Sequence, residues 1–241
     1  MRTRCCIGLI ASVAFCFPAA ARAAEFVFES GPNKVQLLEL FTSEGCSSCP
    51  PAEEWLTKLK QNPGLWRDFV PLAFHVDYWD HLGWRDRFAA KEWTVRQQTY
   101  ATRWNAESVY TPGFVIDGRE LRVPAVPPRS QEMIGSLRLT ISGSDALVTF
   151  HSTKKNARDY EVYLATLGFA LSSDVASGEN HGRKLAHNFV VLSMQKVPLP
   201  AGATEATLSI DKSRVERNGA VAAWVTHSGD PTPIQAVGGW L

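Results

Sequence analysis

The amino-acid sequence predicts an α/β domain followed by a smaller antiparallel β-sandwich-like domain. Two apolar runs of strand length, residues 35–41 and 69–76, enclose a stretch whose apolar residues recur at helical spacing. A strand, a helix and a second strand of this size form one βαβ unit of a parallel sheet. The pattern changes after residue 138, where short β-rich runs are separated by Gly, Ser, Asn and Asp. Such runs are typical of an antiparallel sandwich.

The first 23 residues have the pattern of a signal peptide. Two arginines precede an apolar run over residues 7–17, and Ala-Arg-Ala at 21–23 matches the small-x-small pattern of a signal peptidase site. The apolar run is too short for an ordinary transmembrane helix. We therefore expect cleavage after Ala23, a periplasmic or secreted protein, and no stable membrane insertion after cleavage.

Charge and cysteine content exclude two classes of protein. The formal net charge is +1, so the composition indicates no basic surface for nucleic acid. Three of the five cysteines would leave with the signal peptide, so that Cys46 and Cys49 would remain. One pair cannot form the disulfide network of a small secreted scaffold. The fold must therefore rest on its hydrophobic core.

The first domain contains several further expected elements. A helix is expected to begin near Pro51 or Ala52, because proline is tolerated in the first turn of a helix but costly beyond it. The Asn-Pro-Gly sequence at 62–64 should end this helix. The other expected elements are a helix over 86–104, a strand over 114–118 that ends in an Asp-Gly turn, and a short helix at about 130–137.

The order of these elements around Cys46-Ser47-Ser48-Cys49 resembles the thioredoxin superfamily. More narrowly, four stretches resemble a family of bacterial exported proteins catalogued as domain of unknown function 1223: LELFTSEGCSSCPPAE, HVDYWDHLGWRDRF, VYTPGFVIDG and GENHGRKLAHNFVV. This resemblance covers nearly all of the chain after residue 23. It implies a thioredoxin-like domain with CxxC at residues 24–138 and a β-rich domain at 139–241, and it implies no established activity.

The superfamily resemblance also implies roles for single residues. Cys46 would be an exposed nucleophile and Cys49 the resolving thiol. Thr111-Pro112 lies where the superfamily has a cis-proline that faces the dithiol and pairs with an extended substrate strand; an ordinary trans turn is the alternative. Glu39 lies near the place of a buried acid that accepts the proton of the second cysteine, although a Glu pointing into solvent fits equally well. No cofactor is implied.

These residues together predict an exported thiol–disulfide oxidoreductase. Its partners would be thiols or disulfides of exported proteins or small molecules, together with a redox partner of unknown identity. Two alternatives stay open: a non-enzymatic binding or assembly protein with a structural disulfide, and a copper metallochaperone. The metal alternative depends on His75 and His81, which could join the cysteines as ligands. The CxxC spacing argues against it, because related copper chaperones use CxxxC.

Overall fold

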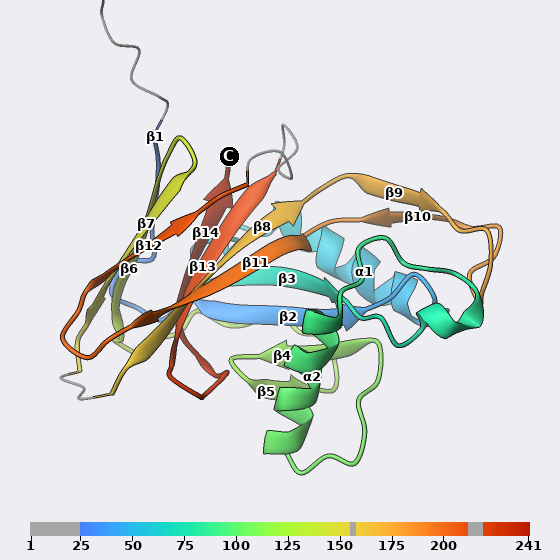
Figure 1. Cartoon of the computed structure of the whole chain (residues 1–241), viewed down its shortest axis with the longest axis horizontal. Coiled ribbons are helices and arrows are strands. Elements are labelled where there is room, and N and C mark those ends of the chain that lie inside the picture. Colours follow the sequence, from blue (N-terminus) through green and yellow to red (C-terminus); the bar gives the residue numbers. More distant parts are fainter. Residues whose placement is uncertain (1–24, 155–157, 212–218) are drawn as a thin grey trace, which may run out of the picture.

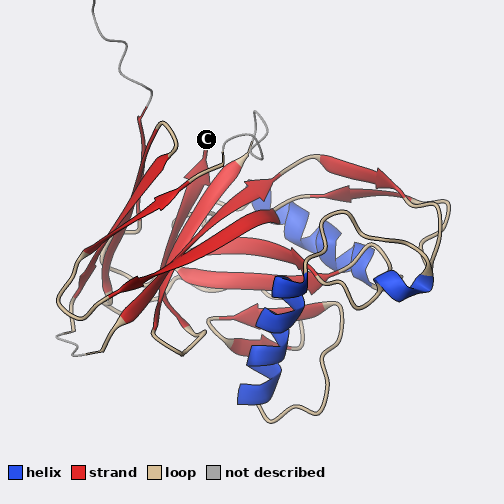
Figure 2. Ribbon diagram, viewed as in Figure 1, coloured by secondary structure: helices blue, strands red, loops and turns tan. Residues whose placement is uncertain are grey.

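The structure, a computed structural model, describes residues 25–154, 158–211 and 219–241. The predicted signal peptide lies outside these residues. The described parts of the chain contain fourteen strands, two α-helices and two short 3-10 helices, so that strands dominate the fold (Figure 2). Among the described residues, no helix is long and apolar enough to cross a membrane.

The elements follow one another in a mixed order along the chain (Figure 1). The first part contains β1 (Glu25–Glu29), β2 (Gln36–Thr42), α1 (Cys49–Lys58), η1 (Leu59–Gln61), β3 (Phe69–His75), η2 (Asp80–Leu82), α2 (Lys91–Arg103), β4 (Gly113–Ile116) and β5 (Arg119–Leu121). The second part contains β6 (Gly135–Ser142), β7 (Asp145–Ser152), β8 (Tyr160–Gly168), β9 (Leu171–Asp174), β10 (Lys184–His187), β11 (Val190–Leu199), β12 (Glu205–Ser209), β13 (Ala220–His227) and β14 (Pro233–Trp240).

A mixed sheet of eight strands runs through most of the molecule, in the order β14-β13-β8-β11-β3-β2-β4-β5. β2 and β3 are parallel and are connected through α1. β3 also pairs in parallel with β11, where Val190 lies opposite Ala73, and the Ala73 amide donates to the Phe189 carbonyl at 2.8 Å. Because of this pairing, the sheet continues from the first part of the chain into the second.

The predicted fold class, an α/β thioredoxin-like domain followed by a smaller antiparallel β-sandwich-like domain, is wrong. The chain is mostly strand, and one mixed sheet takes strands from both predicted parts. The predicted boundary at 138/139 falls inside β6. The short helix expected at 130–137 is also wrong, because burial alternates with period two from Gly135 onward and continues through Ser142. Local patterns identify a strand but not its neighbours in a sheet, which explains the error.

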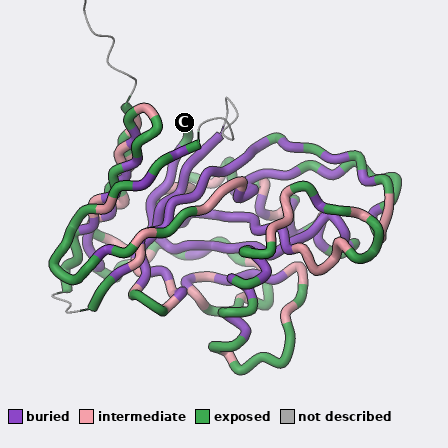
Figure 3. The backbone as a smooth tube through the Cα atoms, viewed as in Figure 1, coloured by how far each residue is buried: buried purple, intermediate pink, exposed green. Residues whose placement is uncertain are grey.

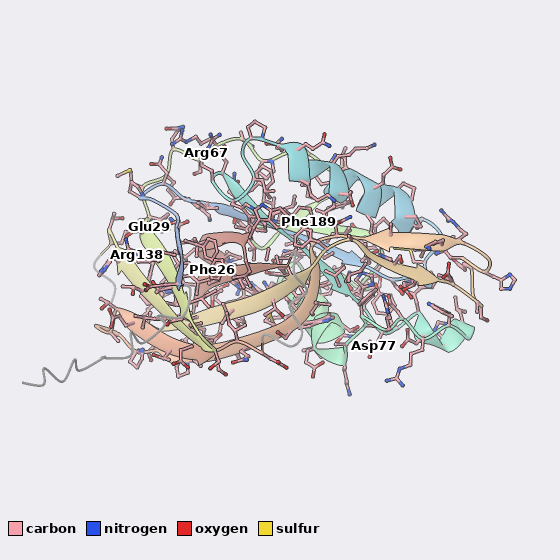
Figure 4. The ribbon with its side chains drawn as sticks, turned by 90° about the horizontal axis from the view of Figure 1, so that it is seen from above. Phe26, Glu29, Arg67, Asp77, Arg138 and Phe189 are labelled. Atoms are coloured by element: carbon pink, nitrogen blue, oxygen red, sulfur yellow. A yellow bond between two sulfur atoms is a disulfide. The ribbon has the colours of Figure 1, made fainter. Side chains whose placement is uncertain are left out.

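The large sheet is buried on both faces along β8 and β13 (Figure 3). In β8, Val162 and Leu164 belong to one hydrophobic core, whereas Tyr163 and Ala165 belong to the other. This alternation follows from the period-two geometry of a strand. The first of these cores lies against the four-stranded sheet β1-β6-β7-β12, whose neighbouring strands β1 and β6 are joined by the ion pair of Glu29 with Arg138 (Figure 4).

The two α-helices begin at positions different from those expected. α1 begins at Cys49, with Pro50 and Pro51 in its first turn, where their missing N–H groups cost nothing. α2 begins at Lys91, later than the predicted Asp86. The side chain of Asp86 accepts hydrogen bonds from the backbone amides of Glu44 and Phe88, which hold residues 86–90 in a loop.

A buried ion pair connects α2 to the large sheet. Arg96 of α2 donates from Nε to Glu39 of β2 at 2.5 Å and from a terminal nitrogen to the Tyr100 hydroxyl at 2.8 Å. The Arg96 guanidinium also lies 5.2 to 5.8 Å from the centroids of four aromatic rings, those of Phe74, Tyr100, Tyr163 and Trp224. These rings come from β3, α2, β8 and β13. Arg96 therefore holds together elements from both parts of the chain.

We predict that Arg96→Met lowers the free energy of unfolding by about 3–5 kcal/mol, because it leaves the Glu39 carboxylate buried without its counter-charge. The matched control is Arg103→Met, which removes the half-exposed ion pair with Asp230 and should cost at most about 1 kcal/mol. The Arg96→Met/Glu39→Leu double variant should recover much of the loss. Urea unfolding of the three variants measures these differences, and equal losses for Arg96→Met and Arg103→Met would contradict this account.

Candidate functional site

Cys46 and Cys49 form a disulfide at the N-terminus of α1. Their Cα atoms are 5.4 Å apart, Cys49 is the first residue of the helix, and Cys46 lies in the turn before it. The exposed fraction is 1% for Cys46 and 0% for Cys49. The expectation of an exposed first cysteine is therefore wrong, because another segment of the chain covers the turn.

The covering segment is residues 178–182, the loop of the β9–β10 hairpin, which extends past the end of α1 (Figure 1). The Asn180 side-chain amide donates to the carbonyl oxygens of Glu44 at 2.8 Å and Cys46 at 3.0 Å. The Ser47 amide in turn donates to the Glu179 carboxylate at 2.9 Å. These three bonds hold the hairpin loop on the cysteine turn.

A buried group of five charged or titratable side chains, the acid–histidine cluster, surrounds the base of this turn: Glu44, Glu53, His75, Asp86 and His187. His187 contacts Glu53 through Nδ1, and its Nε2 lies 3.1 Å from Glu44 Oε1 in an ion-pair contact. His75 Nδ1 lies 2.6 Å from Asp86 Oδ2. The centroids of the two imidazole rings are 5.1 Å apart, and both rings pack edge-on against Phe88.

Two parallel strands and a hairpin bring this cluster together. Glu44 follows β2, while His75 ends β3 and Asp86 lies in the loop beyond it. The carboxyl ends of parallel neighbours meet at the same edge of a sheet, and ligand sites are common there. Glu53 projects from α1, one turn after Cys49, and His187 ends β10.

The cluster favours charged side chains despite its burial. Burial alone would lower the pKa of His187, but the hydrogen bonds and charges of Glu44 and Glu53 outweigh it and raise that pKa to about 10. Burial likewise opposes the charged forms of His75 and Asp86, yet their mutual attraction raises the pKa of His75 and lowers that of Asp86. The pKa of Glu44 is lowered, because hydrogen bonds from His187, Ser173 and Trp84 outweigh its burial.

Comparison with known protein families identifies the family of this chain. The family described as "Protein of unknown function (DUF1223)" matches residues 37–226. The chain belongs to this family. The family resemblance drawn from the four sequence stretches is thus confirmed, whereas the thioredoxin superfamily is not. Comparison with curated proteins gives no match.

Two solved structures resemble this DUF1223 protein. The crystal structure of AGR_C_4864 from Agrobacterium tumefaciens has a TM-score of 0.64 at 26% identity, covering 85% of this chain and 94% of that one. HBP35 of Porphyromonas gingivalis has a TM-score of 0.59 at 12% identity, covering 88% of this chain and 76% of that one, and shows a likeness of fold alone. Both similarities extend over both predicted parts of the chain, in agreement with one shared architecture.

The structure places the remaining predicted site residues in different surroundings. The Thr111–Pro112 peptide bond is cis, the predicted isomer, and Thr111 accepts a hydrogen bond from the Trp79 indole at 2.8 Å. The Cβ of Trp79 lies against Gly45, so this pair is near the cysteine turn. Glu39 is buried, but its carboxylate is bonded to Arg96 and Tyr100 of α2.

The two histidines predicted as candidate metal ligands lie in different places in the DUF1223 structure. His75 lies in the acid–histidine cluster, whereas His81 is exposed and contacts the Tyr78 carbonyl. Residues that could hold a metal are Glu53, His75 and His187, whose ligand atoms lie within 4.8 Å of one another. Sequence reasoning missed Glu53 and His187. The signal for His187 was its place in the GENHGRKLAHNFVV stretch, which had no assigned chemistry.

We predict that Asn180→Ala speeds reduction of the Cys46–Cys49 disulfide by dithiothreitol by about 10-fold, because two hydrogen bonds that close the loop contribute roughly 1–3 kcal/mol together. The matched control is His181→Ala, an exposed neighbour in the same loop. Acid quenching at set times, alkylation of the protein thiols and mass spectrometry compare the two variants. Equal rates would show that Asn180 does not limit access to Cys46.

Proposed function

We propose that this protein is a thiol–disulfide oxidoreductase in which Cys46 exchanges with the substrate and Cys49 resolves the mixed disulfide. The observation that supports this most strongly is the position of the disulfide at the N-terminus of α1. Unpaired backbone N–H groups and the helix dipole favour a thiolate there. A purely structural bridge has no need of this position.

The neighbours of Cys46 support the same chemistry. The Ser48 hydroxyl lies 3.4 Å from the Cys46 sulfur, within reach to donate a hydrogen bond to a thiolate. α1, all of which is described, has no acidic residue in its first turn that would repel negative charge. The hydrogen bond from Ser48 would lower the cost of the thiolate, which is the attacking species in disulfide exchange.

The proposed reaction proceeds in two exchange steps. The Cys46 thiolate attacks a substrate disulfide, forms a mixed disulfide, and releases one substrate sulfur as a thiolate. The Cys49 thiolate then attacks the Cys46 sulfur, which forms the Cys46–Cys49 disulfide and releases the second substrate thiolate. The substrate gains two electrons and the protein loses two. A dithiol partner restores the reduced protein, and the reverse sequence oxidises a substrate dithiol.

Access to Cys46 requires the hairpin loop to move. Asn180 and Glu179 hold this loop on the cysteine turn through three hydrogen bonds to backbone groups. We propose that a substrate displaces residues 178–182 and lies along Thr111–Pro112, because Trp79 binds Thr111 and packs against Gly45 beside the cysteine turn. The proton-acceptor role of Glu39 has less support, because Arg96 and Tyr100 already bind its carboxylate.

We place this reaction in the periplasm or outside the cell. The signal-peptide pattern of residues 1–23 supports export, and exported compartments allow disulfides to form and persist. The proposed substrates are therefore thiols and disulfides of exported proteins or small molecules.

One observation favours a second function, that of a binding or assembly protein with a structural disulfide. Both cysteines are almost fully buried, and buried thiols are generally inert. In this case the disulfide would fix the turn on which the hairpin loop rests.

Trapping of a mixed disulfide distinguishes the two functions. We expect Cys49→Ala to accumulate covalent adducts at Cys46 with oxidised glutathione or with exported proteins, because the resolving thiol is missing. Cys46→Ala is the matched control and should accumulate none, as it lacks the attacking thiolate. Non-reducing gels and mass spectrometry measure the adducts. Absence of adducts in Cys49→Ala, together with no exchange by the wild-type dithiol, would support the structural disulfide instead.

A further inference from the structure

We propose that Glu53, His75 and His187 form a binding site for one divalent transition-metal ion of the zinc class. The three side chains come from α1, β3 and β10, and one ligand atom from each lies within 4.8 Å of the other two. All three residues are buried. This inference does not require the disulfide to react, since neither cysteine belongs to the set.

His75 provides the observation that points to a ligand. Its side chain is 0% exposed, and within the described parts of the chain its Nε2 atom has no hydrogen-bond partner. Its other nitrogen, Nδ1, is bound to Asp86 at 2.6 Å. A buried polar atom without a partner is costly. A histidine that ligates a metal commonly uses its second nitrogen to bind a carboxylate, which fixes the ring and its tautomer.

His187 and Glu53, like His75, each have one polar atom that faces the proposed ion site and a second that contacts a polar group on the other side. Nδ1 of His187 faces Glu53, while Nε2 lies 3.1 Å from the outer carboxylate of Glu44. Glu53 accepts a hydrogen bond from the Thr42 hydroxyl at 2.7 Å on Oε1, and its Oε2 faces His187. Each of the three proposed ligands is therefore held from behind by a second polar group. Such supporting contacts are a normal part of metal sites.

The donor types and charges select the class of ion. Two imidazole nitrogens and one carboxylate oxygen suit Zn²⁺ and similar divalent transition metals, and they suit Ca²⁺ or Mg²⁺ less well. Three carboxylates, those of Glu44, Glu53 and Asp86, lie around the two imidazoles. The two imidazoles would release their protons on binding, and the divalent cation would then replace them as the counter-charge of these carboxylates. The site contains no thiolate and thus differs from a copper site built on the cysteines.

A route from solvent reaches two of the three proposed ligands. A surface pocket of about 220 Å³ lies between α1 and the end of β10, and Glu53 and His187 form part of its wall. The rest of its wall consists of Pro50, Glu54, Thr57, Leu185, Ala186 and Asn188. An ion could enter through this pocket without displacing the hairpin loop from the cysteine turn.

Zinc binding to the full, oxidised chain tests the proposal. After chelator treatment, competition with a chromogenic chelator should show one tight Zn²⁺ equivalent. His75→Ala and His187→Ala should each weaken binding by more than about 100-fold, since loss of an outer partner alone costs about 10–100-fold, the range expected for Asp86→Asn. His81→Ala is the matched control and should bind as wild type does. No tight site in wild type, or unchanged binding in both ligand variants, would overturn the proposal.

Two further measurements complete the test. The first uses the wild-type protein and therefore does not depend on whether a variant folds, and the second separates metal binding from the dithiol chemistry. Co²⁺ bound to the wild-type oxidised protein should give the intense visible absorption of a four- or five-coordinate site, and a weak octahedral spectrum would contradict the proposal. The Cys46→Ser/Cys49→Ser double variant should retain Zn²⁺ binding even though it cannot catalyse disulfide exchange. Loss of binding in this variant, with its fold retained by circular dichroism, would show that the site depends on the cysteine pair and would overturn the proposal.

Discussion

His187 lies between Glu44 and Glu53, the two acidic residues that flank the cysteine turn in the sequence. The contact with Glu53 spans 134 residues of chain and is buried. Removal of His187 would leave the two buried carboxylates with hydrogen bonds from Thr42 and Trp84 but without their counter-charge, and such uncompensated charge is costly. This one imidazole therefore joins the segment before the cysteine turn, α1 and the end of the β9–β10 hairpin.

The large sheet explains how residues so distant meet. The parallel pair of β2 and β3 brings the cysteine turn and the loop after His75 to one edge, and the pairing of β11 with β3 places the β9–β10 hairpin above that edge. Arg96 stabilises the same sheet from its α2 side, through Glu39 and rings from both parts of the chain. The site therefore depends on the continuity of the sheet, and a division into two independent domains would separate its residues.

Much of the local structure could be predicted from the sequence, because it follows from local patterns. Residues 36–42 and 69–75 are strands, a helix follows the cysteines, and Asp117-Gly118 turns a hairpin, as the periodicity and turn residues indicate. Sheet partners could not be predicted in the same way. Nothing near Val190 in the sequence shows that it pairs with Ala73, and so the continuous sheet and the role of His187 were missed.

The strand that contains Glu39 was predicted correctly, but the structure gives little support to the proton-acceptor role predicted for this residue. Its burial was one of the two expected outcomes, but side chains alternate between the faces of a strand. Thr42 points toward α1, where it binds Glu53, and residue 39, three positions earlier, points to the opposite face and binds Arg96. The acidic groups that do lie near the cysteine turn include Glu44, Glu53 and Glu179.

The reduction potential of the Cys46–Cys49 disulfide tests the central claim most directly. Equilibration of the full chain with glutathione or dithiothreitol buffers of known potential gives this value. An exchanging dithiol at a helix N-terminus should have a potential above about −300 mV, within the range of catalytic dithiols. A value well below about −300 mV is typical of an inert structural disulfide and would contradict the proposed oxidoreductase function.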